Sequence, residues 1–168
     1  MAIQYFHIVE EAVKLWLEGK KDFTAVSRWT KTAKLGGKEI LDFDNFVFPA
    51  NVGNRHWILI CMDVKRGKLF VLDSMKGPTH DTLTQNLLKW YEAECRAKKR
   101  AHSPSQWTIH HAYPGTDTAV LQQGNLYDCG VFVCTWADYI GRGKGFGFKE
   151  GDGENFRERL TYALFTSV

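Results

Sequence analysis

Residues 56–74 read HWILICMDVKRGKLFVLDS, and this stretch carries the clearest indication of the fold. Two apolar runs rich in β-forming residues, His56–Asp63 and Leu69–Ser74, flank a short charged connection that contains Gly67. This pattern predicts an antiparallel hairpin. Because both runs are apolar on both faces, we expect the hairpin to lie at the centre of a sheet.

Four segments around the hairpin have the patterns of helices. Apolar residues recur at helical spacing in Phe6–Leu17 and again in Thr82–Arg100, with Asp81 as the expected N-cap of the second. Cys129–Ile140 is hydrophobic nearly all round, which predicts a buried helix, and Phe156–Phe165 is expected to close the chain as a helix.

Two further segments, Ile40–Pro49 and Gln106–His111, have strand-like composition. The mixture of helices and antiparallel strands predicts an α+β domain. We expect a central mixed or antiparallel sheet in which the His-bearing hairpin packs against the buried helix that starts at Cys129.

The composition excludes several classes of protein. The chain has 168 residues, of which 44% are hydrophobic and 24% charged, so it suits one globular domain. The net charge of +3 is too mild to indicate a nucleic-acid binder. No apolar run approaches the roughly 18 residues of a membrane span. Four cysteines without zinc-ligand spacing favour a reducing compartment. We expect the nucleus or cytoplasm, or the host cytosol for an exported effector or a viral protein.

Cys129 is the first candidate for chemistry because it stands at the expected start of a helix. Unpaired N–H groups and a partial positive charge at that position stabilise a thiolate. Gly130 leaves the backbone open to an approaching substrate carbonyl. The ordinary alternative is a small core cysteine. Cys134 points roughly 140° away at about 100° per residue, and we expect it to be buried and inert.

A thiolate nucleophile needs a histidine base, and the hairpin offers one. A turn within residues 64–67 makes the numbers of paired residues sum to roughly 129–132, so His56 lies directly or diagonally across from Asp73. His7 and His80 have no obvious acidic partner in a matching register.

Acyl transfer also needs hydrogen-bond donors for the developing oxyanion. The backbone N–H of Cys129 is one candidate. The side-chain amide of Gln123, six residues upstream, is another, although an amide in such a loop can equally serve turn formation.

Taken together, these segments resemble the Ulp/SENP family of ubiquitin-like-protein (SUMO) proteases. The family has the chain order His, Asp, Gln, Cys, with the Gln six residues before the Cys and an Asp-Cys-Gly core. The segments that carry the likeness are His56-Trp57, Asp73-Ser74 and Gln123–Cys134, supported by Arg28-Trp29, Phe46–His56 and Asn155–Leu164. The likeness runs from about residue 23 to the end of the chain.

The resemblance implies a role for each residue of the catalytic set. Cys129 would be the nucleophile, and His56 the general base and later the acid. Asp73 would fix the imidazole tautomer, and Gln123 would donate to the oxyanion.

The resemblance also implies a substrate-binding surface. Trp57 resembles the tryptophan that roofs a narrow tunnel for a Gly-Gly tail, where only glycine fits beneath an indole; ordinary core packing is the alternative. We place Asp128, Gly130 and Trp29 in the same surface.

Catalytic domains of this family are usually longer and begin with a Trp-Leu-Asn-Asp-like segment, which Met1–Gly19 does not contain. We therefore expect residues 1–168 to form a single catalytic domain of the Ulp/SENP type, shortened at its N-terminus. The chain is either a compact variant or lacks an N-terminal piece.

The leading functional hypothesis is a cysteine protease that cleaves after the C-terminal Gly-Gly of a ubiquitin-like modifier through a thioester. SUMO is the first expectation, in precursors, in conjugates or in both. Alternatives are a deneddylase or deubiquitinase, an acetyltransferase of the same clan, and a catalytically idle modifier-binding module. We expect a monomer that needs no cofactor or metal and whose partner is the modifier and its conjugates, with no membrane or nucleic acid.

Overall fold

The computed structural model describes residues 3–5, 23–27, 30–31, 35–75, 77, 79–101, 106–111, 121–146 and 152–166. The elements, in chain order, are β1 (Ile3–Tyr5), α2 (Thr24–Ser27), the 3-10 helix η3 (Ile40–Asp42), β2 (Asn45–Val52), β3 (His56–Asp63), β4 (Lys68–Leu72), α3 (Asp81–Ala97), β5 (Thr108–His110), α4 (Cys129–Gly141) and α5 (Gly153–Thr166). The predicted helix over Phe6–Leu17, and the Arg28-Trp29 pair, lie outside the described residues.

The sheet is mixed, and the hairpin lies at its centre. Its five strands follow the order β1-β2-β3-β4-β5. The pairs β2–β3 and β3–β4 are antiparallel, whereas β1–β2 and β4–β5 are parallel. In the hairpin, Leu59 pairs with Leu72 and Asp63 with Lys68, a register inside the predicted range. The predictions of an α+β domain and a central hairpin are therefore confirmed.

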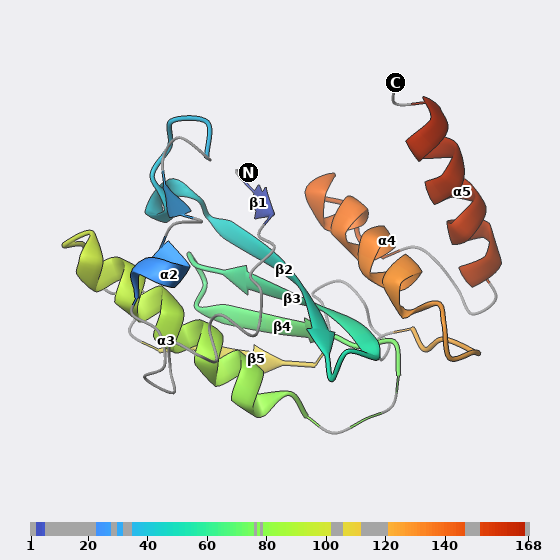
Figure 1. Cartoon of the computed structure of the whole chain (residues 1–168), viewed down its shortest axis with the longest axis horizontal. Coiled ribbons are helices and arrows are strands. Elements are labelled where there is room, and N and C mark those ends of the chain that lie inside the picture. The colour runs from blue at the N-terminus through green and yellow to red at the C-terminus, as the bar shows by residue number, and fades with distance from the viewer. Residues whose placement is uncertain are drawn as a thin grey trace.

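The two faces of the sheet are covered by different helices, as Figure 1 shows. Alternate residues of each central strand point to opposite faces. The α3-side core contains Phe46, Phe48, Ile58, Ile60, Met62, Leu69 and Val71 from the strands, with Leu87, Trp90, Tyr91 and Cys95 from α3. The α4-side core contains Val47, Leu59, Cys61, Phe70 and Leu72 from the strands, with Phe132, Val133, Trp136 and Ile140 from α4. Two cores therefore hold α3 and α4 against one rigid sheet.

The predicted strand over Ile40–Pro49 is wrong in its first half. Residues Ile40–Asp42 form η3, in which the Asp42 carboxylate accepts a hydrogen bond of 3.2 Å from the Glu39 backbone N–H. The strand β2 starts at Asn45 and continues through Pro49 to Val52. Pro49, which has no N–H to donate, pairs with Leu59 of β3 and lies beyond residues 45–47, where the described part of β1 pairs with β2.

Several element ends differ from the expected ones. β4 ends at Leu72, so Asp73 and Ser74 leave the sheet. His80, not Asp81, is the N-cap of α3, and the Asp81 carboxylate instead accepts a 2.8 Å hydrogen bond from the Thr79 hydroxyl. The described strand near residue 108 is shorter than predicted, α3 ends before Arg100, and α5 starts three residues earlier than expected.

The prediction that Cys134 is buried is also wrong, because its side chain is exposed. The inward face of α4 is formed by Phe132, Val133 and Trp136, and Phe132 also contacts Phe156 of α5 at a ring-centroid distance of 6.0 Å. Cys134 lies on the part of the helix surface that neither contact covers. Apolar residues on every side of the α4 sequence therefore did not mean that every side of the helix is buried.

Within the described part of the chain, no helix has the length and apolarity to span a membrane.

Candidate active site

Four elements meet at one end of the sheet. β3 begins at His56, and the chain leaves β4 just before Asp73. α3 begins directly after His80 on one face of the sheet, and α4 begins at Cys129 on the other. The candidate residues therefore stand at the termini of elements whose interiors are packed in the two cores.

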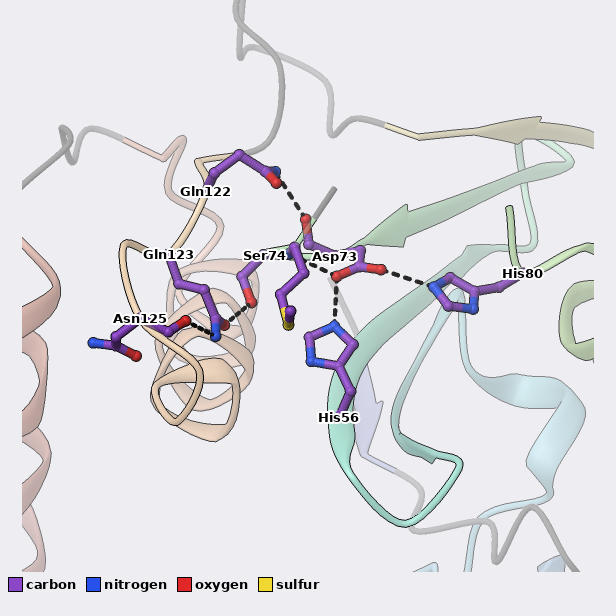
Figure 2. Close-up of polar contacts among 8 residues, drawn as sticks. His56, Asp73, Ser74, His80, Gln122, Gln123 and Asn125 are labelled. Carbon is purple, nitrogen blue, oxygen red and sulfur yellow. Dashed lines mark hydrogen bonds and ion pairs between the residues drawn. The ribbon is translucent and has the colours of Figure 1, made fainter. Parts of the chain in front are cut away.

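His56 and Asp73 are in direct contact (Figure 2). His56 Nε2 lies 2.6 Å from Oδ1 of Asp73, and each side chain is only 17% exposed. The backbone N–H of Met75 donates to the same oxygen at 2.8 Å. The second oxygen, Oδ2, is 2.8 Å from Nε2 of His80. The carboxylate is therefore held on both oxygens.

These contacts determine the ionisation of Asp73. Burial alone would raise its pKa, but hydrogen bonds from His80, the Met75 N–H and His56 outweigh burial and lower the pKa below its ordinary value. An ionised carboxylate can only accept hydrogen bonds, so each imidazole presents a protonated Nε2 to it.

The tautomer of His56 follows from this contact. With its proton on Nε2, the neutral ring carries its lone pair on Nδ1. Nδ1 is buried and has no hydrogen-bond partner among the described residues. His56 thus has the protonation pattern of a general base, because its Nε2–H is held by Asp73 and its Nδ1 lone pair can accept a proton.

Gln123 is fixed from three directions. Its Oε1 accepts a hydrogen bond of 2.6 Å from the hydroxyl of the buried Ser74, and its backbone N–H donates to the Ser74 carbonyl at 2.8 Å. Its Nε2 donates to the Asn125 carbonyl at 2.6 Å. The neighbouring Gln122 donates from Nε2 to the Asp73 carbonyl at 3.1 Å (Figure 2). The loop before α4 is therefore attached directly to the two residues that follow β4.

Cys129 is the first residue of α4 and is 6% exposed. The preceding Asp128 is buried, accepts a 2.7 Å hydrogen bond from Nδ2 of Asn125 and pairs with Arg157 of α5. The bond from Asn125 lowers the pKa of Asp128, burial opposes this, and Arg157 lowers it further. The structure thus places the Asp128 carboxylate in a network within the chain that holds the loop, α4 and α5 together.

Trp57 and Gly130 bring the start of β3 next to the start of α4. A Cβ added at Gly130 would lie 4.0 Å from Cδ1 of Trp57. Trp57 is partly buried and packs against the α4-side core. The residues that directly follow His56 and Cys129 are therefore neighbours in space.

The structure accordingly brings together most of the site predicted from sequence. His56 bonds to Asp73, Gln123 bonds to the residue after Asp73, and Trp57 lies against Gly130 beside Cys129. Trp29 falls outside the described residues.

The expectation that His80 lacks an acidic partner is wrong. The sequence argument searched along strand pairs, whereas His80 reaches Asp73 by a loop that leaves β4 and returns. The Ser74 hydroxyl was also missed as a partner of Gln123. In the sequence, only their positions could have indicated these contacts, because Ser74 follows the acid directly and His80 immediately precedes a helix.

Comparison with known proteins is consistent across sequence and fold. The model of the Ulp1 protease family, C-terminal catalytic domain, matches residues 8–167. Sentrin-specific protease 2 of Homo sapiens is 32% identical over 143 residues, which are 84% of this chain and 23% of the relative. Ubiquitin-like-specific protease ESD4 of Arabidopsis thaliana is 33% identical over 149 residues, which are 87% of this chain and 28% of the relative. The chain spans about a quarter of the length of these relatives.

Solved structures share the fold. SUMO protease Ulp1 with its catalytic cysteine oxidised to a sulfinic acid has a TM-score of 0.74 and 23% identity, covering 99% of this chain and 69% of that one. The C-terminal Ulp1 protease domain in complex with SMT3, the yeast ortholog of SUMO, has a TM-score of 0.73 and 23% identity, covering 98% and 68%. The family model spans nearly the whole chain, and the chain belongs to the Ulp1 protease family of cysteine peptidases.

Proposed function

We propose that this chain is a thiol protease that hydrolyses the bond after the C-terminal glycine of a ubiquitin-like modifier, with SUMO as the foremost substrate. The observation that carries the proposal is the state of His56. Asp73 holds its Nε2–H, and its basic Nδ1 is buried with no hydrogen-bond partner among the described residues. The names of relatives, a sentrin-specific protease and an Ulp1 domain bound to SMT3, support the class of substrate.

In the first step, Nδ1 of His56 takes the proton of the Cys129 thiol. The thiolate, at the positive end of α4, attacks the carbonyl carbon of the modifier's last glycine. Asp73 stabilises the imidazolium that forms. The charge on the carbonyl oxygen is met by the backbone N–H of Cys129, which has no intrahelical acceptor as the first helical residue, and by the second N–H of Gln123 Nε2.

Collapse of the tetrahedral intermediate breaks the C–N bond. The leaving amine, a lysine side chain or a peptide nitrogen, takes the proton from His56 and departs, leaving a thioester on Cys129. His56 then removes a proton from water, which attacks the thioester carbonyl. The thiolate leaves and recovers its proton, and the free carboxylate of the modifier is released.

Selectivity for a glycine tail rests on Trp57 and Gly130. The indole lies next to a residue without a side chain, since a Cβ added at Gly130 would be 4.0 Å from Cδ1 of Trp57, and we propose that the tail passes under this ring to reach Cys129. Tails with larger side chains would collide with the ring before their carbonyl reached Cys129.

The test is covalent labelling by modifiers whose last glycine carries a thiol-reactive group. SUMO-, Nedd- and ubiquitin-type probes would be compared on the wild type, Cys129→Ala and Cys134→Ala. Cys134 is the matched control because it is an exposed cysteine on the same helix. We expect labelling by the SUMO-type probe that is lost only in Cys129→Ala. Failure of every probe to label a folded protein would contradict the proposal.

A further inference from the structure

Asp73 is shared by two histidines, and only one of them is explained by the proposed function. His56 contacts Oδ1, and Nε2 of His80 lies 2.8 Å from the other oxygen, Oδ2 (Figure 2). The His80 side chain is 11% exposed, so this contact is largely shielded from solvent. Such a shielded hydrogen bond to the proposed catalytic acid suggests that His80 has a function in the site.

We propose that His80 is a positioning residue for catalysis, which fixes the plane of the Asp73 carboxylate and through it the ring of His56. The inference rests on the proposed roles of His56 and Asp73. It adds a second imidazole on the far side of the acid to the set predicted from sequence.

Asp73 needs such support because of its place in the chain. β4 ends at Leu72, so the backbone of Asp73 is no longer held by the strand ladder. His56 and the Met75 N–H both contact Oδ1. With only that oxygen held, the carboxylate can still turn about the line from Cβ to Oδ1. The bond from His80 to Oδ2 removes this freedom, because a planar group held at both oxygens has one orientation.

His80 is itself held firmly. It is the N-cap of α3, and its backbone carbonyl accepts the N–H of Thr84 at 3.0 Å. α3 is anchored to the sheet by the fully buried Trp90. The carboxylate is thus braced between β3, which carries His56, and α3, which starts at His80.

The side chain of His80 does not serve the helix end. It makes no capping hydrogen bond, so the cap is formed by the backbone. Replacing the imidazole therefore removes the contact with Asp73 without removing the backbone cap. His80→Gln keeps an N–H donor at nearly the reach of Nε2, and His80→Ala keeps none.

The test measures the rate at which iodoacetamide alkylates Cys129 at neutral pH, followed by mass spectrometry in a Cys134→Ser background. This reaction needs the thiolate and its base but no modifier. We expect His80→Ala to slow it by about tenfold, a part of the roughly 10²–10⁴-fold contribution of a general base. His80→Gln should restore most of the rate. Thr79→Ala, which removes the neighbouring bond to Asp81, is the matched control and should not slow alkylation.

An Asp73→Ala background separates positioning from a general effect on folding. If His80 acts through Asp73, adding His80→Ala there changes the rate by no more than about twofold, because the shared partner is already gone. An equal loss in both backgrounds, or no loss in either, overturns the inference.

His56→Ala separates this inference from the proposed function. If His56→Ala slows alkylation while His80→Ala does not, the base assignment stands and the role of His80 is rejected. If His56→Ala leaves the rate unchanged, the proposed base falls, and the inference falls with it.

Discussion

The Ser74 hydroxyl donates a hydrogen bond of 2.6 Å to Oε1 of Gln123, and this bond decides how the amide is oriented. With Oε1 engaged by Ser74 and one Nε2–H donated to the Asn125 carbonyl, one N–H of the amide remains for a substrate oxygen. Ser74 directly follows Asp73. One short segment after β4 therefore orients both the proposed base, through Asp73, and the proposed oxyanion donor, through Ser74.

Ser74→Ala should lower kcat by about tenfold, less than the roughly 10²–10³-fold cost of deleting an oxyanion donor outright. The amide would lose the partner that sets its orientation. Hydrolysis of a modifier-derived fluorogenic substrate measures the effect. Alkylation of Cys129 by iodoacetamide is the control, because displacement at a CH₂ group develops no oxyanion. An equal loss of alkylation would show that Ser74 acts through Asp73 or the fold instead of through Gln123.

Asp73→Asn should lower kcat by roughly 10³–10⁴-fold, the scale seen when a triad acid becomes an amide. The neutral amide cannot stabilise the imidazolium that His56 becomes. Its oxygen is expected at the Oδ1 position, where the Met75 N–H donates, so its NH2 group meets the Nε2–H of His80 and disturbs the contact that orients residue 73. Steady-state hydrolysis provides the measurement. Asp138→Asn, which affects an ion pair with Arg142 on the surface of α4, is the matched control. Near-normal turnover in Asp73→Asn would contradict the proposed role of the Asp73 charge.

Gly130→Ala should lower the rate of cleavage without lowering the free energy of unfolding. The new Cβ would sit in ordinary van der Waals contact with Trp57, at 4.0 Å, and alanine favours the helix by up to about 1 kcal/mol. The free energy of unfolding in urea should therefore stay the same or rise. Cleavage should fall by at least about tenfold, because the methyl group would meet a glycine tail that, as proposed, passes close to Gly130 to reach Cys129. Full activity in the alanine variant would show that the glycine tail does not approach Cys129 past this residue.

Glu94→Gln should stabilise the protein at neutral pH. Glu94 is 1% exposed, and burial raises the pKa of its carboxyl. The hydrogen bond from the Thr30 hydroxyl and the charge of Lys98 lower this pKa, but burial has the larger effect, so the pKa stays above its ordinary value. A carboxyl whose pKa is raised by folding contributes stability below its unfolded pKa of about 4.3, and this is lost as pH rises through the folded value. Glutamine keeps an acceptor for Thr30 and carries no charge at any pH.

Urea unfolding of the wild type and Glu94→Gln at pH 4 and pH 7 tests this prediction. The gain from glutamine should be larger at pH 7, where the wild-type carboxyl must be buried as an anion. Glu92→Gln, on the exposed side of the same helix, should show little difference between the two pH values. A larger gain at pH 4 would show that burial does not dominate the environment of Glu94.

Local patterns predicted the parts of the fold that depend on neighbouring residues. The two apolar runs around Gly67 predicted the hairpin, its central place and its register. The predicted range of registers placed His56 directly or diagonally opposite Asp73, and the bond between them is present. The start of α4 at Cys129 also agrees with its expected position.

Errors arose where a residue's surroundings are made by distant segments. Cys134 is apolar on an apolar helix, yet it is exposed because the sheet and the contact with Phe156 cover other faces of α4. The strand expected from Ile40 was interrupted because the Asp42 side chain holds the Glu39 backbone in a turn.

The amino-acid sequence specified the central hairpin and the helix that begins at Cys129, and its resemblance to the Ulp/SENP family indicated the full proposed catalytic set. The hairpin and the helix follow from periodicity and spacing over a few residues. The contact of His80 with the Asp73 carboxylate and that of Ser74 with Gln123 emerged from the three-dimensional structure alone. Both contacts join loops whose paths depend on how two helices pack on opposite faces of the sheet, and no local pattern specifies where such loops meet.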